Sequence, residues 1–114
     1  MKTFEFLNRV ELRGIVGSEP KITEVGGTAA ARFPLCTNET CRDSAGTVCI
    51  ETTWHSVTAW AGPRVCNLAD IHKGDAVHVE GRLGYNYYTC PSGEQRSAVE
   101  VRVTRMHKVS AAGE

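Results

Sequence analysis

Apolar and polar residues alternate along most of this chain. A period of two residues predicts β-strands, because successive side chains of a strand point to opposite faces. The pattern predicts a long first strand over residues 4–17, with a short continuation over residues 21–25. Further strands are predicted over residues 28–38, 52–61 (beginning as early as Cys49), 75–83 and 97–108.

Residues 52–61 depart from the usual form of this pattern. Trp54 and Trp60 share one face with Ser56 and Thr58, while Val57 and other small residues occupy the opposite face. A strand stabilised only by burial would place its tryptophans on the same face as Val57. The pattern therefore predicts that this strand presents flat aromatic surfaces to a ligand.

One helix is predicted, over residues 63–73. Pro63 suits the first helical position, apolar residues recur with helical spacing, and Gly74 suits the residue that follows the helix.

The connections between strands are rich in turn-forming residues. Gly26-Gly27 predicts a tight turn, and the polar residues 39–48 predict an exposed loop. Residues 84–95 predict a projecting hairpin with its tip at Pro91-Ser92-Gly93.

The resulting order is three strands, a helix and two strands. It matches an all-β, five-stranded Greek-key barrel with one short helix between strands 3 and 4, the oligonucleotide/oligosaccharide-binding fold. We expect a single domain over residues 1–110, with a projecting hairpin between strands 4 and 5 and a frayed end over residues 111–114.

Composition narrows the possible functions only slightly. The 114 residues include 13 Lys plus Arg and 13 Asp plus Glu, so bulk charge does not indicate nucleic-acid binding, although charge can be segregated by face. No apolar run reaches the length of a membrane span, and the N-terminus lacks the pattern of a signal peptide. We therefore expect a cytoplasmic protein.

Cysteine and histidine residues do not form a recognisable metal or catalytic pattern. The five cysteines include no CxxC pair, so we expect no metal and no cofactor, and we expect free thiols. His55 lies on the apolar face of its strand and is expected to be buried or at a subunit interface. No Ser, Cys and His arrangement resembles a catalytic triad, so we expect no enzymatic activity. A small enzyme that uses cysteine and histidine is the alternative that a thiol-reactivity scan would test.

Five segments in this order carry a resemblance to a known family. They are NRVELRGIVGSEP, GGTAAARFPLCTNETCRD, TTWHSVTAW, HKGDAVHVEGRL and SGEQRSAVEVRV. From about Asn8 to Val103 the chain resembles the bacterial single-stranded DNA-binding proteins. The resemblance implies sequence-nonspecific binding of single-stranded DNA in replication, recombination and repair, in a nucleoid-associated protein.

The resemblance also implies which residues contact the DNA. Family members stack bases on aromatic rings and neutralise phosphates with cations. The stacking positions match Trp54, Trp60 and Tyr88, with Tyr85 and Tyr87 as further candidates. The candidate phosphate contacts are Arg42, Lys73, Arg82 and Arg96.

The chain departs from the family at two places that bear on binding. Cys41 occupies a loop position where the family often stacks a tryptophan, and residues 84–88 carry aromatics where the family has cations. We therefore expect weaker, less salt-dependent binding than is usual for the family. The sequence also ends without the family's acidic tip, which favours, as an alternative, a primosome-like protein-interaction module with weak single-stranded DNA binding.

Outward residues of the first predicted strand indicate an interface between subunits. Glu11, Arg13 and Ile15 of this strand, together with His55, match positions where the family associates. The resemblance implies a homotetramer, with a dimer as the fallback.

Overall fold

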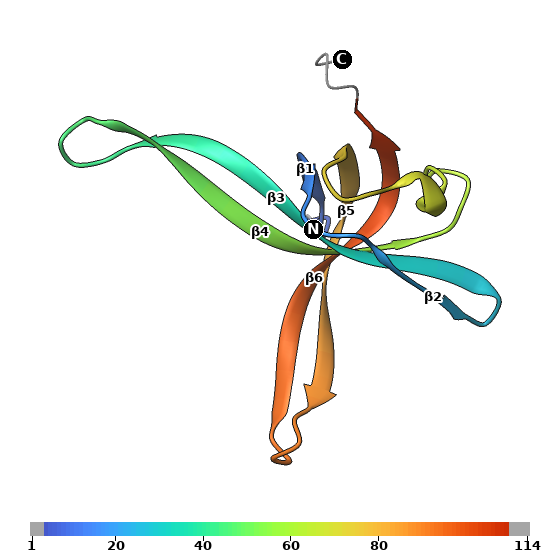
Figure 1. The fold of residues 1–114 in the computed structure, drawn as a ribbon. Helices are drawn as coiled ribbons and strands as arrows, with labels where there is room; N and C mark the ends of the chain where they lie inside the picture. Colours follow the sequence, from blue (N-terminus) through green and yellow to red (C-terminus); the bar gives the residue numbers. More distant parts are fainter. Residues whose placement is uncertain (1–3, 110–114) are drawn as a thin grey trace.

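The computed structural model describes residues 4–109, which form six strands and one short 3₁₀ helix (Figure 1). The predicted frayed end over residues 111–114 lies outside this range. The elements are β1 (Val10–Val16), β2 (Lys21–Val25), β3 (Thr28–Arg42), β4 (Val48–Trp60), η1 (Leu68–Asp70), β5 (Ala76–Thr89) and β6 (Gln95–Lys108).

Five of the strands close into a barrel. The sheet order is β1-β5-β6-β4-β3-β2, and β1 also pairs with β3 to complete the ring. All pairings are antiparallel except that of β4 with β6. This closed mixed barrel confirms the predicted fold, and β2 continues it as a hairpin with β3.

Gly14 is what lets β1 cross closely over β3. A side chain at Gly14 would collide with the carbonyl oxygen of Cys36, so the two backbones approach within a distance that only glycine permits. The next residues, Ile15 and Val16, pair with Cys36 and Leu35.

The inward faces of the strands fill the barrel. The alternation predicted from the sequence places these residues correctly along β3, β4 and the first half of β5. Continued over residues 75–83 and 97–108, the same two-residue period puts Leu83 and Val99 on inward faces, yet both are exposed. Leu83 lies beyond Gly81, where the pairing of β5 with β1 ends, and Val99 precedes Val101, where the pairing of β6 with β4 begins. The core consists of Val16, Ala31, Phe33, Leu35, Val57, Ala59, Leu68, Ile71, Val77, Val79, Val101 and Met106.

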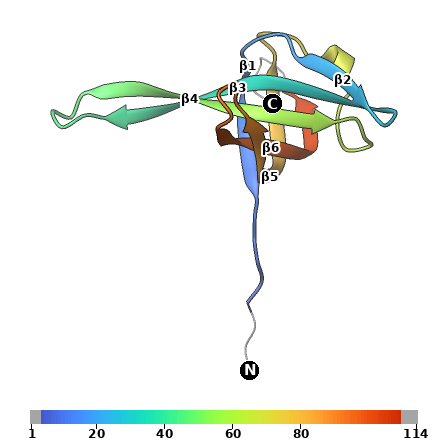
Figure 2. The same ribbon diagram turned by 90° about the horizontal axis from the view of Figure 1, so that it is seen from below.

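Three hairpin arms project from the barrel in different directions (Figure 1). They are formed by β2 with β3, β3 with β4, and β5 with β6. Figure 2 shows the β3–β4 arm leaving the barrel at one side. The predicted hairpin between the fourth and fifth strands of the barrel is the β5–β6 arm.

The β3–β4 arm corrects the expected loop over residues 39–48. The strands stay paired as far as Arg42 and Val48, so only the residues between them form a turn. Asp43 closes that turn, because its carboxylate accepts hydrogen bonds from the backbone of Ala45 and Thr47, both 2.9 Å long. The sequence does not predict this part of the strands, because an arm outside the barrel faces no core and therefore shows no alternation of apolar and polar residues.

Two other predicted boundaries are corrected. The first strand begins at Val10 rather than residue 4, because its pairing with β5 begins at Val10 opposite Gly81. The helix expected over residues 63–73 shrinks to Leu68–Asp70. Its first part is a turn followed by a β-bridge between Val65 and Met106. Cys66 donates a backbone hydrogen bond to Met106, which in turn donates to Arg64, both 3.0 Å long. None of the helices in residues 4–109 is long and apolar enough to cross a membrane.

Candidate nucleic-acid interface

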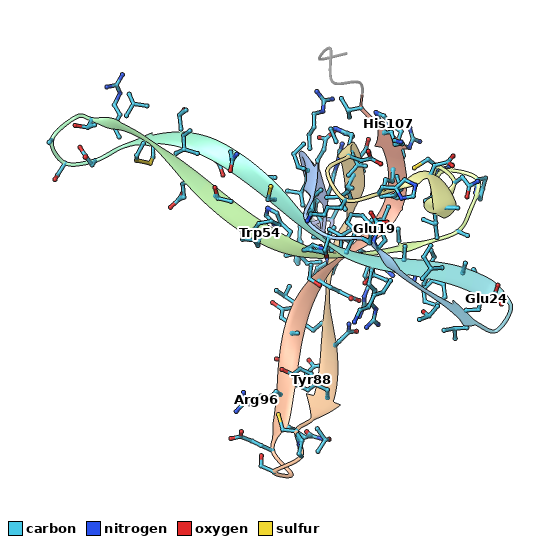
Figure 3. All side chains as sticks on the ribbon, viewed as in Figure 1. Glu19, Glu24, Trp54, Tyr88, Arg96 and His107 are labelled. Atoms are coloured by element: carbon cyan, nitrogen blue, oxygen red, sulfur yellow. A yellow bond between two sulfur atoms is a disulfide. The ribbon has the colours of Figure 1, made fainter. Side chains whose placement is uncertain are left out.

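The outer face of β4 presents both tryptophans to solvent. Trp54 is 60% exposed and Trp60 is 42% exposed, whereas Val57 and Ala59 between them point into the core. The predicted exposure of both tryptophans is therefore confirmed, whereas Thr58, predicted on the same face, is buried. Figure 3 shows Trp54 where the β3–β4 arm joins the barrel.

Glycine also fixes the position of the Trp54 ring. A side chain at Gly17 would collide with the edge of that ring, so the indole lies directly against the backbone after β1. Gly17 is itself held by a 2.9 Å hydrogen bond from its N–H to the carbonyl of Pro34 on β3. The ring is supported on one side, while more than half of the residue remains accessible to a ligand.

Arg32 lies between the two tryptophans on the same face. It pairs in register with Thr58, while Trp60 pairs with Ala30 and Trp54 with Cys36. The Arg32 side chain is exposed, and no ion pair or hydrogen bond holds it among residues 4–109. The sequence did not single out this residue, since a lone outward arginine in a strand is usually only solvated.

Three open hollows meet at Arg32. One of about 430 Å³ contains Trp54, one of about 490 Å³ contains Trp60, and one of about 530 Å³ contains Tyr88. Each of the three is lined by Arg32. The three aromatic residues that the resemblance singles out are thus connected by one cation.

The hollow beside Trp60 carries most of the charge. Its cations are Arg32, Arg82 and Arg102, and its one carboxylate belongs to Glu100. Glu100 is 7% exposed and accepts hydrogen bonds from Thr58 (2.8 Å), Asn86 (2.8 Å) and Arg102 (3.0 Å).

These contacts keep Glu100 ionised. Burial acts to raise the pKa of Glu100, but the three hydrogen bonds and the charge of Arg102 outweigh it, so the pKa lies below its ordinary value. The hollow therefore holds three guanidinium groups against one carboxylate.

The sequence matches the single-strand binding protein family model over residues 7–109. The chain belongs to this family. It is 35% identical to a single-stranded DNA-binding protein of Bacteroides thetaiotaomicron, over 94% of this chain and 68% of that protein. It is 34% identical to the mitochondrial single-stranded DNA-binding protein of Bos taurus, over 83% of this chain and 70% of that protein.

A solved structure agrees with this assignment. The Plasmodium falciparum SSB complex with ssDNA superimposes with a TM-score of 0.79 at 26% identity, covering 96% of this chain and all of that one. This chain spans about two thirds of the curated relatives' length, for example 66% of a Chlorobaculum tepidum single-stranded DNA-binding protein that is 34% identical over 92% of this chain. The resemblance seen in the sequence is confirmed.

Two of the three tyrosines on the β5–β6 arm of this family member, Tyr87 and Tyr88, line one of the hollows that meet at Arg32. Tyr88 lines a hollow with Asn86, and Figure 3 shows it part-way along the arm. Tyr87 lines the same hollow and is 77% exposed. Tyr85 is exposed but lines none of the three hollows that meet at Arg32.

The four cations predicted to bind phosphate are not together. Arg82 lines the hollow beside Trp60. Arg42 lies near the tip of the β3–β4 arm and donates a 3.0 Å hydrogen bond to the carbonyl of Gly46. Arg96 lies on the β5–β6 arm and pairs with Glu94 at 3.0 Å, and Lys73 lies before β5. Of these four cations, Arg82 alone lines one of the three hollows that meet at Arg32.

Residues of the expected subunit interface lie on β1 and at the root of the β3–β4 arm. Ile15 is 43% exposed. Glu11 and Arg13 both contact His78 on β5, at 2.9 and 3.2 Å. His55 is half-buried and shares a 2.9 Å hydrogen bond with Thr37. All of these contacts lie within one chain, so the subunit interface stays a prediction.

Glu11, His78 and Glu80 are close enough to form a metal site. Their ligand atoms lie within 4.8 Å of one another, a proximity that their spacing in the sequence does not reveal. However, both ring nitrogens of His78 already have hydrogen-bond partners, because Arg13 donates to Nδ1 and Nε2 lies 2.9 Å from the Glu11 carboxylate. His78 therefore offers no free lone pair to a cation.

One expectation about the cysteines is wrong. Cys41 and Cys49 pair in register across the β3–β4 arm and are joined by a disulfide, whereas Cys36, Cys66 and Cys90 are free thiols. The bond was not predictable from spacing, because it depends on the extension of both strands beyond the barrel. At the position where the family often stacks a tryptophan, this chain has a covalent link between its strands.

Proposed function

We propose that this single-stranded DNA-binding protein holds an unpaired strand against the outer face of β3 and β4, without sequence preference. The observation that carries the proposal is the exposure of Trp54 and Trp60 on one face with Arg32 between them. Every base has a flat π-face, so stacking tolerates any sequence, and each stacked base contributes about 1–3 kcal/mol.

The arrangement of the hollows supports a continuous track for the strand. Since Arg32 lines all three, bases on Trp54, Trp60 and Tyr88 would leave a phosphate within reach of the same guanidinium. Arg82 adds a second cation to this track. We place Arg42, Lys73 and Arg96 as outlying contacts, and Tyr85 and Tyr87 as secondary stacking residues on the β5–β6 arm.

Local charge supports this function although the formal net charge is zero. In the hollow beside Trp60, three arginines face one carboxylate that already accepts three hydrogen bonds. A cleft of one sign attracts an oppositely charged ligand more strongly than the whole-molecule charge implies. Electrostatic attraction is thus concentrated beside an exposed tryptophan.

Binding alone is the activity that we propose. The family consists of non-catalytic DNA-binding proteins, which supports roles in replication, recombination and repair. We propose that the protein acts in the cytoplasm at the nucleoid. We propose a homotetramer as its assembly, with a dimer as the alternative. Its interface would use Glu11, Arg13, Ile15 and His55.

The direct experiment is a titration with oligo(dT) that follows tryptophan fluorescence. We expect quenching as bases stack on the indole rings, similar quenching with oligo(dC), and much weaker binding of a duplex of the same length. The absence of both quenching and binding at low salt would contradict the proposal.

A further inference from the structure

Arg102 on β6 reaches across the neighbouring strand β5. Its Nε donates a 3.0 Å hydrogen bond to Glu100, and its Nη2 donates a 3.0 Å hydrogen bond to the backbone carbonyl of Tyr85. Nη2 also lies 3.4 Å from the side-chain oxygen of Asn86. The guanidinium is therefore held over β5 rather than extended into solvent.

Gly84 provides the space for this position. A side chain at residue 84 would collide with Nε and Cζ of Arg102. The backbone angle φ of Gly84 is not positive, so space rather than backbone conformation is what requires glycine here. The Arg102 guanidinium occupies the volume over β5 in which a side chain of residue 84 would stand.

Glu100 is the buried carboxylate to which the Arg102 guanidinium is anchored. One carboxylate oxygen accepts from Thr58 and Asn86, and the other accepts from Arg102. The Glu100 side chain is 9% exposed and the Arg102 side chain is 40% exposed. The carboxylate is buried and held by three hydrogen bonds, while part of the guanidinium faces the hollow that contains Trp60.

A second arginine lies directly opposite. Arg82 and Arg102 are register partners on β5 and β6, and both line the same hollow. Like charges at opposed positions of a sheet destabilise the pair, and one carboxylate compensates only one of them. An anion in the hollow would compensate the other. Nη1 of Arg102 makes no hydrogen bond within residues 4–109, so its N–H groups are available to that anion.

We propose that Arg102 binds a phosphate of the single strand, positioned by Glu100 and by the missing side chain of Gly84. Residues 84–88 of β5 carry aromatics where the family has cations, and Arg102 would supply a cation to the same region from β6. This inference rests on the proposed function, namely that the hollow beside Trp60 holds DNA. An arginine fork that is already held loses less conformational freedom on binding phosphate than a free side chain does.

The test is the salt dependence of oligo(dT) binding in the full chain. We expect Arg102→Ala to weaken binding about tenfold at moderate salt and to reduce the slope of log K against log[salt] by about 0.7, the value for one phosphate contact on a single strand. Arg105→Ala is the matched control. It removes the same charge from the same strand, but Arg105 lines none of the three hollows that meet at Arg32.

A charge-neutral variant tests the positioning. Gly84→Ala displaces the Arg102 side chain from its held position without removing a charge, so we expect weaker binding in the wild-type background. In the Arg102→Ala background the same change should have no further effect, which completes a double-mutant cycle. Arg102→Lys keeps the charge but not the fork, so it should retain the salt slope with an intermediate affinity.

The outcomes separate the inference from the proposed function. Wild-type affinity and slope in Arg102→Ala would overturn the role of Arg102. A Gly84→Ala effect that persists without Arg102 would overturn the positioning. If thermal unfolding shows that Arg102→Ala is not folded, Gly84→Ala and Arg102→Lys test the inference in its place. Wild-type affinity in both of these variants would overturn it. A wild-type protein that does not bind oligo(dT) at all would instead contradict the proposed function.

Discussion

Arg32 and Thr58 are partners across β3 and β4, and their side chains serve opposite purposes. Thr58 is buried and donates its hydroxyl hydrogen to Glu100, whereas Arg32 stands exposed between Trp54 and Trp60. The two-residue period places the Thr58 hydroxyl on an outward polar face, but it is buried and holds Glu100 at the floor of the hollow. The exposed outer face is therefore narrower, and richer in aromatic and cationic groups, than alternation alone implies.

Removing either tryptophan ring should weaken DNA binding. We expect Trp54→Ala and Trp60→Ala each to reduce the affinity for oligo(dT) by about 1–3 kcal/mol, because each loses one stacked base. Fluorescence anisotropy with labelled oligo(dT) measures the effect without depending on the lost indole. The matched Phe variants keep a flat ring and should retain most of the affinity. Equal binding by the Ala and Phe variants would show that the rings do not stack.

Removing Arg32 should change the salt dependence of binding. We expect Arg32→Ala to reduce the slope of log K against log[salt] by about 0.7, because one phosphate contact to a single strand is lost. The losses with oligo(dT) and oligo(dC) should be similar, since a phosphate contact carries no sequence information. Arg64→Ala, another exposed arginine outside the hollows that meet at Arg32, is the control. A slope identical to that of the wild type would exclude Arg32 as a phosphate contact.

The sequence predicts the barrel because its strands face a core. Residues 52–61 alternate clearly, and the exposure of Trp54 and Trp60 follows from that period. This alternation is lost in the β3–β4 arm, where both faces are exposed to solvent and the polar residues 39–42 predict a loop. It is also lost in residues 63–67, where backbone hydrogen bonds to Met106 replace those of the predicted helix.

The charged part of the candidate site is harder to predict. An outward arginine has no periodic signal, so the position of Arg32 depends on the register of β3 with β4. Arg102 becomes relevant only because Gly84 lies beside it on β5, a neighbour 18 residues away in the sequence. The resemblance singled out cations at Arg42 and Arg96, which the structure places near the ends of different arms.

Acid should destabilise the fold partly through Glu100. Its folded-state pKa lies below the ordinary value of 4.5, so the unfolded state binds more protons in the acid range. The resulting stabilisation is complete above the unfolded pKa and is lost as the pH falls through the folded pKa. Urea unfolding as a function of pH should show a shallower acid slope in Glu100→Gln than in the wild type. Glu19 and Asp75, whose pKa values are also lowered by hydrogen bonds from backbone N–H groups, should maintain a residual slope. An unchanged slope would exclude Glu100 as a contributor.

Breaking the disulfide should loosen one arm and spare the barrel. In Cys41→Ser/Cys49→Ser we expect faster hydrogen exchange near the tip of the β3–β4 arm, because the closed loop spans a sequence separation of only 8. The loss of global stability should stay below about 3 kcal/mol, since short loops gain little from closure. Cys90→Ser, near the tip of the other long arm, should leave this exchange unchanged. Faster exchange throughout the barrel would contradict a local role for the bond.

The proposed subunit interface is open to a direct measurement of mass. We expect Ile15→Asp to lower the mass of the assembly measured by light scattering, because the exposed Ile15 side chain would be replaced by a charge at the interface. Val25→Asp, at an exposed position near the tip of the β2–β3 arm, is the control and should keep the wild-type mass. A wild-type mass in both variants would remove Ile15 from the interface.

The three arms also affect how that mass must be measured. The Cα radius of gyration is 16.9 Å, whereas a compact domain of 114 residues has a radius of about 13 Å. Arms that project from a small barrel raise the friction of the molecule in water without adding mass. Size-exclusion chromatography calibrated with spherical standards would therefore overestimate the number of subunits, and sedimentation equilibrium or light scattering would not.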